Sequence, residues 1–266
     1  MTANSQRIVL PDEKPPLFPG DGVVMYLYPP RRPGPRSDVG IIVLPIQGGD
    51  YEISTLFAEY FQSKGFHALR FERRAEWLDA SREVSDLQLL VKQFLADVSR
   101  GIDWWLEQGE NGPKRLGLFG VSMGANTGAV VAAGDPRIEA AVLPLGGGDL
   151  ADILMTAHDE EINLYRKNLA ARLGVEEPAL RPVLEEALKP VDNLNFAHGM
   201  NAGTTLFMSA RFDRVVKYAN ATRLWECIGR PKRIVLPCGH YSTIVFLPLV
   251  KLWARRWFDR FLTDAS

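Results

Sequence analysis

The chain has 266 residues, of which 46% are hydrophobic and 24% charged, with 31 Lys and Arg against 32 Asp and Glu. This length suits a single α/β domain. The net charge of −1, with both signs interspersed, excludes the basic surface that nucleic acids and anionic membranes require, so we expect a small or neutral substrate and no nucleic acid.

Targeting and redox signals are weak. The first residues lack the basic and apolar segments of a signal peptide, and no run of about eighteen apolar residues predicts a membrane span. We therefore expect a cytoplasmic protein. Cys227 and Cys238 are too few and too irregularly placed for a disulfide framework or a zinc site, which predicts two reduced thiols.

The chain alternates short apolar runs with amphipathic segments after a Pro/Arg-rich loop at residues 29–36, which follows a hairpin-like region. Runs of strand length predict strands, and apolar residues at intervals of three and four predict helices. In chain order the predicted elements are strand 39–46, helix 54–65, strand 66–71, helix 85–108, strand 115–120, helix 123–133, strand 138–147, a mixed-charge helical segment, strand 204–210, helix 216–228, strand 233–238 and helix 247–262. Apolar strands that alternate with helices predict a mainly parallel sheet covered on both faces.

The segments that directly follow the predicted strands are the candidates for chemistry, because ligands of such sheets bind beyond the carboxyl ends of the strands. Four of these segments carry suitable residues: "QGGD" at 47–50, "VSMG" at 121–124, "RFDR" at 211–214 and "GHYS" at 239–242.

The third parallel strand leads into Gly120-Val121-Ser122-Met123-Gly124, which fits the pattern G-x-S-x-G between a strand and a helix. A serine on such a tight turn needs small residues two positions before and after it, so that the strand and the helix can approach. Gly120 and Gly124 meet this need. The pattern favours a nucleophile at Ser122 over a serine that serves only the turn.

A serine nucleophile needs a base, and the base needs an orienting carboxylate. His240 and Asp213 follow two strands and are the candidates for these roles. Asp213 has an alternative role as a cap of the helix that begins near Val216. Asp192 is a competing acid, but it precedes a strand rather than following one.

The remaining histidines are less well placed than His240. His67 lies at a strand, and His198 lies in the approach to one. His158, followed by Asp159, Glu160 and Glu161, offers a metal-binding alternative, although a solvated acidic helix face accounts for the same residues. We expect no metal and no cofactor.

The order Ser122, Asp213, His240 resembles that of the α/β-hydrolases, from about residue 39 to the C-terminus. The stretch "WECIGRPKRIVLPCGHYS" is most similar to the esterase and dienelactone-hydrolase branches. The resemblance implies a mainly parallel central sheet flanked by helices on both faces. It also implies a core of residues 1–149 and 201–266, with a helical cap inserted at residues 150–200.

The resemblance further implies an oxyanion hole of two backbone N–H groups, which would stabilise a tetrahedral intermediate. Met123, directly after the nucleophile, supplies the first. The second falls in "VLPIQGGD", where many relatives carry His-Gly, and corresponds to Gln47 with Ile46 as the alternative.

The expected cap presents apolar residues at helical spacing. In α/β-hydrolases such an insertion commonly covers the active site, so its residues either line a pocket or pack the cap onto the core. The candidates in the cap are Ile153, Leu154, Met155, Leu164 and Leu169, and the pocket is expected to include Ile46, Leu154 and Tyr241.

These features predict a serine hydrolase that cleaves carboxylic esters through an acyl-enzyme on Ser122, with a small-molecule acyl ester as substrate. The same three residues would serve a thioesterase, a peptidase or an acyltransferase, because they specify acyl transfer and not the leaving group. A non-catalytic binding protein with this fold is a further alternative. We expect a monomer or a homodimer.

Overall fold

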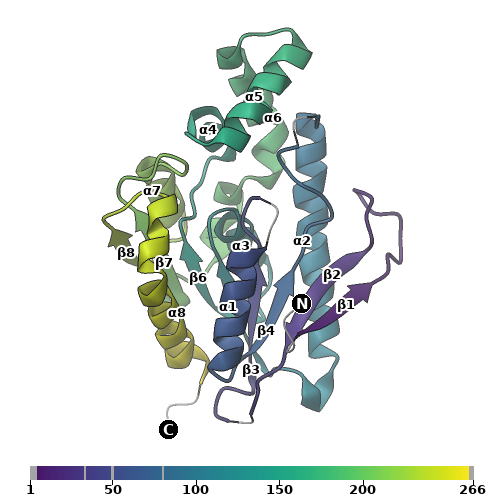
Figure 1. Cartoon of the computed structure of the whole chain (residues 1–266), viewed down its shortest axis with the longest axis vertical. Helices are drawn as coiled ribbons and strands as arrows, with labels where there is room; N and C mark the ends of the chain where they lie inside the picture. Colours follow the sequence, from purple (N-terminus) through teal and green to yellow (C-terminus); the bar gives the residue numbers. More distant parts are fainter. Residues whose placement is uncertain (1–4, 33, 49–50, 80, 264–266) are drawn as a thin grey trace.

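The computed structural model describes residues 5–32, 34–48, 51–79 and 81–263. Its centre is an eight-stranded sheet with the strand order β1-β2-β4-β3-β5-β6-β7-β8 (Figure 1). Strands β3 to β8 run parallel, whereas β2 is antiparallel to both β1 and β4. The expected mainly parallel sheet is confirmed, and the hairpin-like N-terminal region is the β1–β2 pair. The strands are β1 (Gln6–Leu10), β2 (Val23–Tyr28), β3 (Val39–Leu44), β4 (His67–Phe71), β5 (Arg115–Gly120), β6 (Ile138–Pro144), β7 (Thr205–Ala210) and β8 (Lys232–Leu236).

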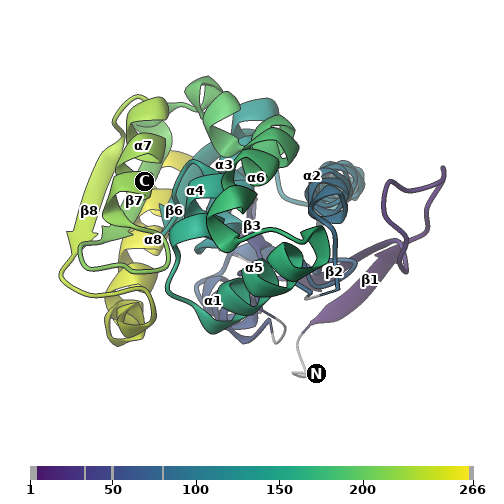
Figure 2. The same cartoon turned by 90° about the horizontal axis from the view of Figure 1, so that it is seen from above.

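Helices cover both faces of the sheet (Figures 1 and 2). Successive side chains of a strand point to opposite faces. In β3, Ile42 and Leu44 join the core that includes helices α2, α3 and α7, whereas Ile41 and Val43 join the core that includes α1 and α8. A strand buried on both faces explains why β3 reads as a continuous apolar run. The covering helices are α1 (Glu52–Ser63), α2 (Val84–Leu106), α3 (Met123–Gly134), α7 (Tyr218–Cys227) and α8 (Leu247–Leu262).

The segment between β6 and β7 contributes helices α4 (Leu150–Thr156), α5 (Glu160–Leu173) and α6 (Leu180–Leu188). Figure 1 shows them beyond the edge of the sheet where the parallel strands end. Asp149 and Asp159 cap α4 and α5, each accepting a hydrogen bond from a backbone N–H three residues later. The position of α4, α5 and α6 in Figure 1 places these helices over the edge where ligands of such sheets bind.

Many boundaries differ from the expected ones by one to three residues, and two of the differences have a clear structural cause. Strand β6 ends at Pro144 rather than at 147, because Leu145 adopts φ 60° and turns the chain away. Helix α7 begins at Tyr218 rather than at 216, because Val215 and Val216 belong to the turn that Asp213 stabilises.

Candidate active site

Ser122 lies on the turn between β5 and α3, with φ 53° and ψ −115°. A positive φ is uncommon for a residue with a side chain and indicates backbone strain. The Ser122 N–H donates to Pro144 O at 2.9 Å, which joins the turn to the end of β6. The strained turn places Ser122 in the lining of a cavity at the carboxyl edge of the sheet.

The two glycines of the turn are required by close backbone contacts. A Cβ on Gly120 would lie 2.1 Å from Gly124 O. A Cβ on Gly124 would lie 2.7 Å from Leu44 O and 2.8 Å from Pro45 O, at the start of the loop after β3. Small residues are thus needed on both sides of Ser122, as expected, because any larger side chain would clash with the backbone at these positions.

Asp213 and His240 are paired at the ends of β7 and β8. His240 Nδ1 and Asp213 Oδ2 are 2.7 Å apart, and the Asp213 side chain is 2% exposed against 11% for His240. Asp213 Oδ1 accepts the N–H groups of Val215 and Val216 at 2.8 and 2.9 Å. The carboxylate therefore caps the following turn and contacts the imidazole at the same time, so the two roles considered for it are compatible.

The loops that carry this pair lie side by side. Arg211 N–H donates to Leu236 O at 2.8 Å, and Phe212 N–H donates to Cys238 O at 2.9 Å. These bonds continue the β7–β8 pairing past both strands, so the spacing of Asp213 and His240 is set by sheet geometry.

The competing acid, Asp192, has a different place. Its Oδ2 accepts from Leu150 N–H at 2.6 Å and its Oδ1 accepts from Leu194 N–H at 2.9 Å, at the base of the helical segment. It does not line the cavity of Ser122. Asp192 therefore connects the two ends of the insertion, and Asp213 is the acid next to His240.

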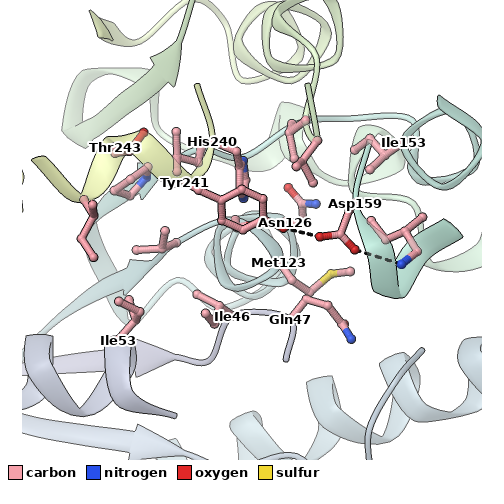
Figure 3. A pocket seen from close by; sticks show the side chains of 18 of the residues that line it. Ile46, Gln47, Ile53, Met123, Asn126, Ile153, Asp159, His240, Tyr241 and Thr243 are labelled. Carbon is pink, nitrogen blue, oxygen red and sulfur yellow. Dashed lines mark hydrogen bonds between the residues drawn. The ribbon is translucent and has the colours of Figure 1, made fainter. Parts of the chain in front are cut away.

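The cavity has a volume of about 270 Å³, and Ser122, Met123 and His240 all line it. Ile46, Gln47 and Tyr241 line it as well (Figure 3). Its wall is mostly apolar and includes the loops after β3, β5, β6, β7 and β8 and parts of α1, α3, α4, α5 and α8. The apolar wall residues include Ile53, Phe57, Leu78, Leu145, Ile153, Leu154, Ile162, Val216, Ile244, Leu247 and Val250.

Two of the five apolar residues singled out in the insertion line this cavity, namely Ile153 and Leu154. The other three do not. Leu164 is 55% exposed, and Leu169 is fully buried in the core beneath α5. Met155 packs against that same core. Helical spacing identified the apolar positions but did not show whether each side chain points into the cavity, into the core or toward solvent.

The segment at residues 158–161, before and at the start of α5, contacts three of the loops at the cavity, those after β3, β7 and β8. His158 N–H donates to Arg214 O at 2.8 Å, next to Asp213. The Tyr241 hydroxyl donates to the Asp159 carboxylate beside His240 (Figure 3), and Gln47 Nε2 donates to Glu161 Oε2 at 3.4 Å.

The expected solvated acidic face holds for Glu160 and Glu161, which are exposed, whereas Asp159 is half-buried. Asp159 and Glu161 also line the cavity. The position of Asp159 just before a predicted helical segment could have indicated that its carboxylate caps the start of that helix, because aspartate favours the N-cap. Burial raises the pKa of the Glu161 carboxyl. Burial and the hydrogen bond to Asp159 raise the pKa of the Tyr241 phenol. Among the described residues, no group of three or more His, Cys, Asp or Glu could hold a metal ion.

The backbone N–H groups of Met123 and Gln47 face no protein acceptor within the part of the chain that the structure describes. Both residues line the cavity together with Ser122. Gly49 and Asp50 of the "QGGD" segment lie outside the described residues. Within the described residues these are two donors without a protein acceptor, in a cavity that Ser122 also lines. Helix α3 begins at Met123, which adds the positive end of its dipole.

Comparisons with known proteins give the fold. No protein-family model and no curated protein matches the sequence. The structure is similar to that of the Pyrococcus horikoshii acylaminoacyl peptidase (TM-score 0.67, 14% identity, 99% of this chain and 42% of that chain). It is also similar to the Pyrococcus furiosus esterase Pf2001 (TM-score 0.65, 16% identity, 97% and 91%) and to a 2,6-dihydroxy-pseudo-oxynicotine hydrolase (TM-score 0.66, 16%, 98% and 68%).

These similarities, with the observed strand order, show that the chain has the α/β-hydrolase fold. The chain spans about 42% of the peptidase but most of the esterase. In the described residues, no helix is long and apolar enough to cross a membrane.

Proposed function

We propose that the protein is a serine hydrolase that cleaves carboxylic esters of small molecules through an acyl-enzyme on Ser122. The observation that carries the proposal is that one apolar cavity is lined both by a serine on a strained turn and by a histidine paired with a buried carboxylate. Solved structures of the same fold include an esterase and a peptidase, which supports hydrolysis in general.

In the proposed mechanism His240 takes the proton from Ser122 as the hydroxyl oxygen attacks the ester carbonyl. Asp213 holds the imidazole through Nδ1, so that Nε2 is left to act as the base, and it stabilises the imidazolium that forms. The N–H groups of Met123 and Gln47 bind the negative oxygen of the tetrahedral intermediate. His240 then protonates the alcohol as it leaves.

Deacylation repeats these steps with water as the nucleophile. His240 removes a proton from the water, the hydroxide attacks the acyl-enzyme carbonyl, and the acid leaves as the proton returns to Ser122. This chemistry draws on side chains and backbone groups alone and requires no metal or cofactor. We further propose that residues 150–200 act as a cap on a core of residues 1–149 and 201–266.

The cavity supports a preference for apolar acyl groups of moderate length. Its volume of about 270 Å³ lies just under the range of about 300–1,000 Å³ found for sites of drug-sized ligands. Hydrolysis of p-nitrophenyl esters from acetate to palmitate tests this directly. We expect kcat/KM to peak between butyrate and octanoate and to be much lower for palmitate.

The alternative activities that use the same chemistry are tested in the same assay. A thioester of the best acyl group, an acylated p-nitroanilide and an added alcohol acceptor test for thioesterase, peptidase and acyltransferase activity. Turnover of the anilide faster than of the matched ester would replace the ester proposal with a peptidase. No turnover of any of these substrates by folded protein would favour a binding protein.

A further inference from the structure

Arg73 is a buried cation beneath the loop that follows β3. It lies two residues beyond the end of β4, and its side chain is 1% exposed. The guanidinium donates to Ile46 O from Nη1 at 2.8 Å and to Gly48 O from Nη2 at 2.6 Å. These two carbonyls flank Gln47. Arg73 does not itself line the cavity.

Several contacts hold Arg73 itself in place. Its Nη2 lies 3.1 Å from Glu76 Oε1, and its backbone N–H donates to the Tyr51 hydroxyl at 2.9 Å. Its guanidinium carbon lies 5.3 Å from the centre of the Tyr51 ring and 5.9 Å from that of the Trp77 ring. A buried guanidinium with these partners is a rigid anchor.

The geometry of the peptide bond links this anchor to the cavity. Ile46 O and Gln47 N–H belong to the same planar peptide group, and in the trans form they point in opposite directions. An anchor that holds Ile46 O on the Arg73 side therefore aims Gln47 N–H away from Arg73. Gln47 lines the cavity, and its N–H has no acceptor among the described residues.

We infer that Arg73 is a positioning residue for the oxyanion hole, which orients the Gln47 N–H toward the carbonyl oxygen of the substrate. This inference rests on the proposed function, and it selects Gln47 over Ile46 as the second donor. The charged hydrogen bond to Ile46 O also polarises the shared peptide group, which makes Gln47 N–H a stronger donor.

The neighbouring Arg74 provides a matched control. Its side chain is 3% exposed and pairs with Asp12 at 2.6 Å and Asp97 at 2.7 Å, and no contact joins it to residues 46–48. Arg74→Met removes a buried guanidinium of the same size from the adjacent position. A loss of activity shared by Arg73→Met and Arg74→Met reflects impaired folding. A loss of activity confined to Arg73→Met reflects the contacts of Arg73 with the loop that follows β3.

The test compares wild type, Arg73→Met and Arg74→Met in ester hydrolysis and in inhibition by a trifluoromethyl ketone, which forms a tetrahedral adduct with a nucleophilic serine. Removal of a whole oxyanion donor lowers kcat by about 100- to 1,000-fold. A misaligned donor should cost less, so we expect Arg73→Met to lower kcat and ketone affinity by about 10- to 100-fold, with KM within about threefold of wild type.

Arg74→Met should be less stable to heat while its kcat stays within about threefold of wild type. The inference is overturned if kcat of Arg73→Met falls no more than that of Arg74→Met, or if KM rises with kcat unchanged. If Arg73→Met does not fold, Arg73→Lys carries the same test, because a single ammonium does not reproduce the two-pronged contact. A kcat of Arg73→Lys equal to that of wild type would then overturn it.

The rate at which a fluorophosphonate labels Ser122 separates this inference from the proposed function, because that reaction also develops charge on an oxygen in the hole. If wild type is labelled but hydrolyses no ester, the proposed function fails. The ratio of labelling rates of wild type and Arg73→Met then decides the inference by the same criterion. If wild type is not labelled, both are overturned.

Discussion

The change Asp213→Asn separates the orientation of His240 from the shape of the site. The amide of asparagine has the size of the carboxylate but offers one acceptor oxygen and one NH₂ donor. Val215 and Val216 N–H point at one oxygen position at 2.8 and 2.9 Å, so the amide oxygen must occupy it. The amide NH₂ then faces His240 Nδ1 at the place where a 2.7 Å contact now exists.

An NH₂ group at this place forces Nδ1 to accept a hydrogen bond, which moves the imidazole proton to Nε2. The base that should take the proton of Ser122 is then blocked. In a serine protease the corresponding change lowers kcat by about 10⁴-fold, which is a loss of about 5.4 kcal/mol in transition-state stabilisation. We expect a loss of about 10³- to 10⁴-fold near pH 7, with KM little changed.

The assay is kcat and KM on the best ester near pH 7, with thermal unfolding as the measure of folding. Asp192→Asn is the control, since the Asp192 carboxylate accepts the N–H groups of Leu150 and Leu194 and does not line the cavity. The reasoning is refuted if Asp213→Asn keeps a tenth or more of the wild-type kcat, or if Asp192→Asn is the more damaging change.

Three further changes test the turn that carries Ser122, the cavity wall and the ion pair between Asp12 and Arg74. Gly124→Ala places a Cβ 2.7 Å from Leu44 O; it should lower the free energy of unfolding in urea by about 1–3 kcal/mol and lower kcat as well, and an unchanged urea midpoint would contradict the close contact. Leu154→Ala opens the cavity wall and should shift kcat/KM toward octanoate over acetate by up to about 1–3 kcal/mol, whereas an equal loss on both esters would make Leu154 a packing residue only. The hydrogen bond from Arg74 lowers the pKa of Asp12, so the ionised Asp12 stabilises the folded protein fully above the ordinary pKa of about 3.9, and this stabilisation disappears as the pH falls through the lower folded-state pKa. Urea midpoints measured from about pH 5 to pH 2.5 should therefore fall less steeply in Asp12→Asn than in wild type, and parallel curves would refute this.

The local part of the site was predictable from the sequence because one short segment specifies it. Gly120 and Gly124 indicate a turn between β5 and α3, and both elements follow directly from the apolar pattern around them. The positions of Asp213 and His240 followed from the rule that strands of a parallel sheet end at one edge. Local patterns of this kind can be recognised in the sequence because they depend on residues that are neighbours along the chain.

Contacts between distant segments could not be read in the same way. The bonds from Arg73 to the carbonyls of Ile46 and Gly48 join residues of different loops, and nothing in the apolar spacing marks Arg73 apart from Arg74. The end of β6 was placed too late because an apolar run does not show the turn at Leu145. Leu169 met the spacing of a pocket residue but packs into the core.

The most direct test of the central claim is the location of the acyl group during turnover. Wild type and Ser122→Ala are mixed with a p-nitrophenyl ester, quenched at the end of the initial burst, and digested for peptide mass analysis. We predict an acyl group on the peptide that contains Ser122 in wild type. In Ser122→Ala, which should remain folded, we predict neither acyl group nor burst. An acyl group on another residue, or ester turnover retained by Ser122→Ala, would contradict the account.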